Sequence, residues 1–113
     1  MNITFAPTRS ATDSGAASSF DRFAIDGEAC VRLPEANAFG LTGEMIRKVT
    51  GEPMRCRGCI PPERVGVFIQ HLHREICVAH WTHSGGEDKV RALHQLERVA
   101  QIAYREEAAV SWC

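Results

Sequence analysis

The sequence predicts a mainly α fold: a long antiparallel helical hairpin with a short helix and short extended N-terminal segments added to it. Two stretches, residues 62–83 and 87–111, repeat apolar side chains with the period of a helix. The glycine pair at 85–86 separates them, so a short turn would bring the two helices side by side. A length of 113 residues and a hydrophobic content of 44% suit one core.

The N-terminal region divides into two parts. Residues 1–19 are expected to form a flexible tail, because most of them are small and polar and offset little of the entropy lost on ordering. Residues 20–113 are expected to form a single helical domain. At its start, residues 23–33 alternate apolar and polar side chains around an Asp-Gly turn signal at 26–27. This pattern predicts a short hairpin or two extended segments.

A short helix is expected to begin at Thr42, whose hydroxyl is of the type that caps a helix N-terminus. Leu41 and Ile46 have the spacing of the apolar pair that packs across such a start. Gly51 can adopt the left-handed conformation that ends a helix, and Pro53 follows it. The predicted helix is therefore short, about two turns.

The two long helices have clear core faces. Pro62 opens the first, with Glu63 in its first turn where the helix dipole favours an acidic side chain. Its predicted core residues are Val65, Phe68, Ile69, Leu72, Ile76 and Ala79. The core residues predicted for the second are Ala92, Leu93, Leu96, Val99, Ala100, Ala103, Tyr104 and Val110.

Charge and hydropathy restrict the function classes. Thirteen basic and fourteen acidic residues give a net charge of -1, so non-specific binding to nucleic acid or to an anionic membrane is not expected. The chain shows neither an export signal nor a long apolar run, which predicts a cytoplasmic protein. It also lacks short catalytic motifs such as G-x-S-x-G, H-E-x-x-H or a Gly-rich phosphate loop. We therefore expect a protein that is not an enzyme.

The sharpest local pattern has the spacing of a C-x2-C...H-x3-C zinc finger and consists of Cys56, Cys59, His73 and Cys77. Zinc binds four thiolate or imidazole ligands in a tetrahedron, and His73 and Cys77 lie one helical turn apart. A zinc-binding interaction module is therefore one alternative. A thiol oxidoreductase is another, because Cys56 and Cys59 just precede the positive end of a helix dipole. The remaining alternative is that Cys56 and Cys59 are loop thiols and that His73 and Cys77 are ordinary helix-flank residues.

Apolar side chains outside the core stripes indicate a protein-binding surface, because interfaces are built from such anchors surrounded by polar groups. The candidate partner-binding residues are Val67, His71, Arg74, Val78 and Trp81 on the first long helix and Ile102 on the second. Trp112 adds another large amphipathic ring near the C-terminus. The alternative is that these side chains pack against the N-terminal segments of the same chain.

The block GLTGEMIRKVTGEPMRCRGCIPPERVGVFIQHLHREICVAHW, residues 40–81, resembles the QslA-like quorum-sensing anti-activators of pseudomonads, as does the length of the chain. The resemblance implies a non-enzymatic homodimer. Such a protein would bind the ligand-binding part of a LuxR-type transcription factor such as LasR and block its dimerisation and DNA binding. The resemblance assigns no individual contact residue, and it leaves the high Cys and His content unexplained.

Overall fold

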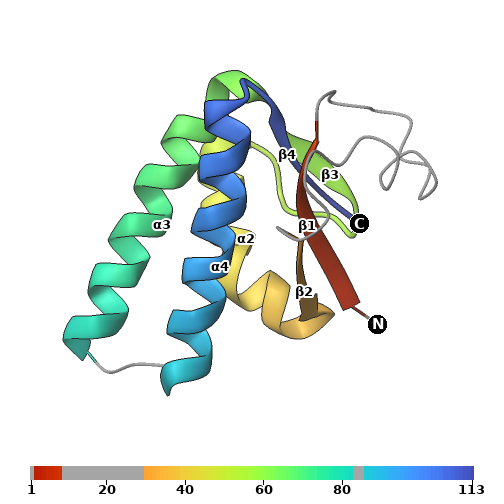
Figure 1. Cartoon of the computed structure of the whole chain (residues 1–113). Coiled ribbons are helices and arrows are strands. Elements are labelled where there is room, and N and C mark those ends of the chain that lie inside the picture. Colours follow the sequence, from red (N-terminus) through yellow and green to blue (C-terminus); the bar gives the residue numbers. More distant parts are fainter. Residues whose placement is uncertain (1, 9–29, 83–85) are drawn as a thin grey trace.

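The computed structural model of the protein describes residues 2–8, 30–82 and 86–113 (Figure 1). In chain order the elements are β1 (Asn2–Thr8), β2 (Val31–Pro34), α2 (Glu35–Thr50), β3 (Gly58–Ile60), α3 (Pro62–Thr82), α4 (Gly86–Arg105) and β4 (Ala109–Trp112). Figure 1 shows the helices on one side of the strands, with α3 running beside α4 on the outside of the molecule. The described residues therefore form a mixed α/β fold.

The prediction of a mainly α fold is wrong, because four strands form an antiparallel sheet in the order β2-β1-β4-β3. The N-terminal strand β1 is central: Phe5 faces Val31 of β2 on one side and Trp112 of β4 on the other. Residues 2–8 of the predicted tail are therefore part of the sheet. The Ile-Thr-Phe run at 3–5 has good strand formers, but it is short and borders a polar segment, so its pattern was weak.

The remaining N-terminal predictions fall mostly outside the described residues. Met1 and residues 9–29 contain the rest of the predicted tail, the boundary of the predicted domain 20–113 and the first half of the predicted hairpin. The second half of the predicted hairpin is confirmed as an extended segment, because residues 31–34 form β2. Among the described residues, β2 pairs with the strand β1.

The helix predicted to run to Ser111 ends at Arg105. Glu107 adopts a left-handed conformation with φ 54. The Ala108 N–H donates to the Ala103 carbonyl at 2.7 Å, and the Glu107 N–H donates to the Tyr104 carbonyl at 3.2 Å. These are the two hydrogen bonds of a Schellman helix end. Glycine or asparagine usually occupies the left-handed position, so a glutamate there gave no stop signal.

Beyond this helix end the chain forms the strand β4, and all four residues of this strand are buried. Val110 was predicted to lie on a helix stripe and instead faces Ile60 of β3 and Pro7 of β1. The prediction was wrong because Ala109 and its neighbours continue a helix-like composition without a Gly or Pro break.

A glycine at position 107 is expected to stabilise the protein. The left-handed conformation costs a residue with a Cβ about 1–2 kcal/mol. The greater freedom of glycine in the unfolded chain offsets about 0.4–1 kcal/mol of that gain. We expect Glu107→Gly to raise the free energy of unfolding by up to about 1 kcal/mol, and Glu107→Val to lower it, because β-branched side chains avoid this conformation. Urea denaturation measures the free energy of unfolding of both variants. A glycine variant less stable than the valine variant would contradict the left-handed conformation of residue 107.

The helix α2 begins at Glu35, so the prediction that Thr42 caps its N-terminus is wrong. Pro34 occupies the N-cap position and makes no side-chain cap hydrogen bond. Thr42 is fully buried within the helix, where its hydroxyl donates to the Ala38 carbonyl at 2.7 Å and lies 3.3 Å from the sulfur of Met54. A threonine can satisfy its hydroxyl inside a helix in this way, so the residue type alone did not mark the start.

Other helix predictions are confirmed. The helix α2 ends at Gly51, which has φ 81 and donates its N–H to the Arg47 carbonyl at 2.8 Å. The helix α3 has the predicted start and ends at Thr82, and α4 begins at Gly86, while residues 83–85 lie outside the described residues. On α3 the predicted core residues Val65, Phe68, Leu72, Ile76 and Ala79 are buried, and Ile69 is half-buried.

The core lies between the sheet and the helices and includes Trp112 of β4. Only 4% of Trp112 is exposed, its ring centroid is 6.0 Å from that of Phe5, and its Nε1 donates to the Arg55 carbonyl at 2.8 Å. Trp112 is therefore a core residue and not the surface ring that the sequence indicated. Among the described residues, no helix is long and apolar enough to cross a membrane.

Candidate functional site

The outer face of α3 carries five of the six predicted partner-binding residues. Val67, His71, Arg74, Val78 and Trp81 follow one another at alternating spacings of four and three residues. At about 100° per residue they fall within about 80° of the helix circumference, on the side opposite the buried core residues. We call this set of five residues the α3 stripe. Its spacing is the heptad spacing of helices that pack against other helices.

The α3 stripe leaves large apolar side chains in solvent. Trp81 is 86% exposed, Val78 is 47% exposed and Val67 is 36% exposed. Arg74 is exposed as well, and His71 is half-buried. An exposed tryptophan is unusual because its side chain gains more than most from burial. The stripe thus combines one large aromatic anchor with two aliphatic side chains and one permanent positive charge.

Ile102, the sixth predicted partner-binding residue, lies elsewhere. It belongs to α4, is half-buried and packs against the hydrophobic core. Its apolar side chain therefore has a role inside the chain. The structure does not bring it together with the α3 stripe as one exposed patch.

Tyr104 of α4 is an exposed aromatic residue that the sequence placed in the core. It is 61% exposed, and its ring lies over Gly66 of α3, where an added Cβ would be 3.3 Å from the ring. Together with His73 and Gln101 it lines an open hollow of about 440 Å³ between the two helices. The signal that could have located this contact is Gly66, because a glycine inside a helix costs about 1 kcal/mol and often marks a close approach.

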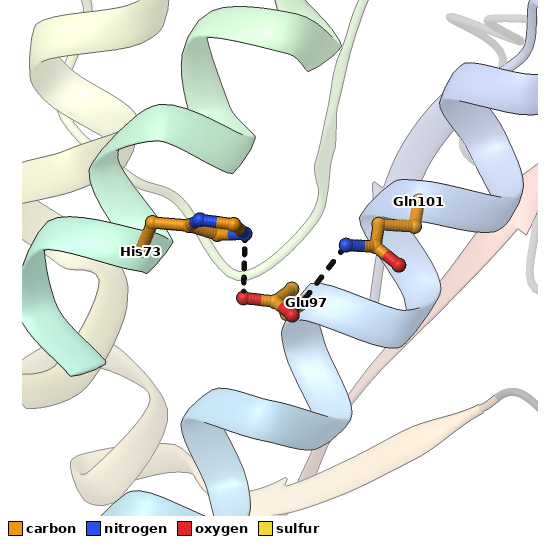
Figure 2. A network of polar contacts seen from close by, with 3 residues as sticks. All are labelled: His73, Glu97 and Gln101. Atoms are coloured by element: carbon orange, nitrogen blue, oxygen red, sulfur yellow. Dashed lines mark hydrogen bonds and ion pairs between the residues drawn. The ribbon is translucent and has the colours of Figure 1, made fainter. Parts of the chain in front are cut away.

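A short polar network joins α3 to α4 (Figure 2). The Nε2 atom of His73 lies 2.9 Å from a carboxylate oxygen of Glu97, and the Gln101 side-chain amide donates to the other oxygen at 3.4 Å. The His73 side chain is 55% exposed, so this contact contributes at most about 1 kcal/mol to stability. Its main effect is to fix His73 against α4 in this conformation.

The four residues of the predicted zinc site are distributed over two parts of the structure. Cys56 is an exposed thiol in the loop after α2, with its sulfur 3.6 Å from a Glu35 carboxylate oxygen, and Cys59 is half-buried in β3. His73 and the exposed Cys77 belong to α3. Within residues 2–8, 30–82 and 86–113, no three His, Cys, Asp or Glu side chains are grouped to hold a metal ion. The zinc module and the thiol oxidoreductase stay predictions.

Gly58, between the two cysteines, has a structural role that the sequence did not reveal. A Cβ at this position would lie 2.8 Å from the Trp112 ring. Such a distance is too short for a real side chain, so the glycine lets β3 approach the buried indole. This packing explains the glycine in the C-x2-C segment without a metal ion.

No family model, no curated protein and no solved structure matches this chain. What bears on its function is therefore the chemistry of its own residues and the resemblance of residues 40–81.

Proposed function

We propose that the protein acts by binding another protein through the α3 stripe and does not catalyse a reaction. The observation that carries the proposal is the exposure of Trp81, at 86%, in line with two exposed valines on one helix face. Tryptophan and arginine are the residues most enriched among those that dominate binding energies, and the stripe holds both Trp81 and Arg74. Its heptad spacing favours a helix of the partner as the surface that it contacts.

The specific form of the proposal is an anti-activator. In this form the protein sequesters a LuxR-type transcription factor and blocks its dimerisation and DNA binding. Support comes from the resemblance of residues 40–81 to QslA-like anti-activators, and all five residues of the α3 stripe lie within that block. A net charge of -1 agrees with action on a protein and not on the DNA itself.

Affinity capture from an extract of the host tests both levels of the proposal. The bait proteins are the wild type, a Val78→Glu, Trp81→Glu variant, and a Tyr104→Glu control that changes an exposed aromatic residue outside the stripe. We expect the wild type and the control to retain the same protein and the stripe variant to lose it, because a buried unpaired carboxylate opposes association.

Three outcomes would count against the proposal at different levels. Retention of no protein by the wild type would contradict protein binding, and equal retention by all three baits would contradict the α3 stripe as the site. Retention of a protein that is not a LuxR-type regulator would contradict the anti-activator form alone.

A homodimer is part of the same proposal, and its interface must lie outside the α3 stripe if the stripe is to bind the partner. Size-exclusion chromatography with light scattering gives the mass in solution. We expect a dimer that the Val78→Glu, Trp81→Glu variant retains. A wild-type monomer would contradict the homodimer, and a dimer that this variant loses would place self-association on the stripe.

A further inference from the structure

Two histidines from different helices lie side by side on the surface. The rings of His80 on α3 and His94 on α4 have centroids 6.1 Å apart and planes inclined at 61°. Both side chains are exposed. Neither residue belongs to the α3 stripe or to the predicted zinc finger, and the proposed function uses neither of them.

The separation of the two rings suits a shared metal ion. A divalent transition metal binds an imidazole nitrogen at about 2.0–2.1 Å, so two imidazoles on one ion have ring centroids about 5 Å apart in a tetrahedral site and up to about 6.4 Å apart when they are trans. The observed 6.1 Å is about 1 Å wider than the tetrahedral separation, and small side-chain rotations can close that difference. Both rings are exposed, so they can rotate about their side-chain torsions to direct one nitrogen each at a common point.

We propose that His80 and His94 form a two-histidine site for a divalent transition-metal ion that bridges α3 and α4. No three metal-binding side chains are grouped in the part of the chain that the structure describes, and within that part His80 and His94 are the two ligands proposed. Imidazole ligands suit Zn²⁺, Ni²⁺ and Cu²⁺ and not the oxygen-seeking Mg²⁺ or Ca²⁺. Arg91 and Arg98, each about one turn from His94, repel all divalent cations alike, so the selection of transition metals rests on the two imidazole bonds alone.

The site exists only where α3 packs against α4. His80 is two residues from the end of α3, and His94 is in the first half of α4, so 13 residues separate them along the chain. An ion that joins them therefore binds the folded chain in preference to the unfolded chain, and it stabilises the helical pair.

Calorimetric titration of the full chain with Ni²⁺ tests the proposal, with Zn²⁺ in a parallel titration. The protein carries no histidine tag and is kept reduced. The variants are His80→Ala and His94→Ala, and the controls are His71→Ala on another face of α3 and a Cys56→Ser, Cys59→Ser double variant. All five proteins are checked for folding by circular dichroism.

We expect one equivalent of Ni²⁺ to bind the wild type and both controls. Each of His80→Ala and His94→Ala should weaken binding by about 100-fold, because the second ligand on a rigid scaffold acts at a high effective concentration. The metal should also raise the melting temperature of the wild type and not of these two variants. Absence of binding to the wild type, or binding that survives in His80→Ala and His94→Ala, would overturn the proposal.

Discussion

Replacement of Phe5 by alanine is expected to lower the free energy of unfolding by about 3–5 kcal/mol, the usual cost of removing a fully buried phenylalanine. Phe5 has no exposed surface, lies on the central strand β1 and packs against Trp112. In a domain of this size such a loss is a large part of the total stability. Urea or thermal denaturation followed by circular dichroism measures the change.

The matched control is Asn2→Ala, because Asn2 is exposed at the start of the same strand. Its expected effect is below about 0.5 kcal/mol. If the N-terminal residues were a flexible tail, Phe5→Ala would be as neutral as the control. The pair of variants therefore separates the sheet described by the structure from the tail predicted by the sequence.

Replacement of Trp81 by alanine is expected to weaken binding to the protein partner by about 30-fold or more, the loss typical of a dominant interface residue. Because Trp81 is 86% exposed in the free protein, the same change should alter the free energy of unfolding by less than about 0.5 kcal/mol. Surface plasmon resonance with the captured partner and urea denaturation give the two values.

Tyr104→Ala serves as the control for Trp81, because Tyr104 is an exposed aromatic residue outside the α3 stripe. Its affinity for the partner should equal that of the wild type. A loss of affinity in Tyr104→Ala with no loss in Trp81→Ala would indicate that the partner binds at the hollow between α3 and α4 and not at the α3 stripe.

The sequence predicted the elements that an amphipathic pattern defines. The stripe of buried residues on α3, which includes Phe68 and Leu72, follows from helical spacing alone. The end of α2 at Gly51 follows from the one residue type that adopts φ 81 without strain. These features depend on neighbours along the chain, so a local pattern was sufficient.

The sheet could not be predicted in the same way, because its order depends on contacts between distant residues. The strand β1 pairs with β4 across more than 100 positions, as in the facing of Phe5 and Trp112. The start of β4 was hidden because Glu107 ends α4 in a conformation that its residue type rarely adopts. Thr42 led to a wrong prediction of the start of α2, because a residue type that often caps a helix lies inside this helix.

For the candidate site, the sequence located the α3 stripe but not its surroundings. The heptad spacing from Val67 to Trp81 was visible in one helix, and the structure adds the exposure of its large side chains. The approach of Tyr104 to Gly66 and the pairing of His80 with His94 depend on how α3 packs against α4. Packing of this kind is decided by the whole core and not by spacing within one segment.

Tryptophan fluorescence tests the central claim most directly. The chain has two tryptophans, of which Trp81 is 86% exposed and Trp112 is 4% exposed, so the difference between the wild type and Trp81→Phe isolates the signal of Trp81. We predict that acrylamide quenches this signal strongly in the free protein and much less in the complex with the partner. A Trp81 signal that remains equally quenchable in the complex would contradict binding through the α3 stripe.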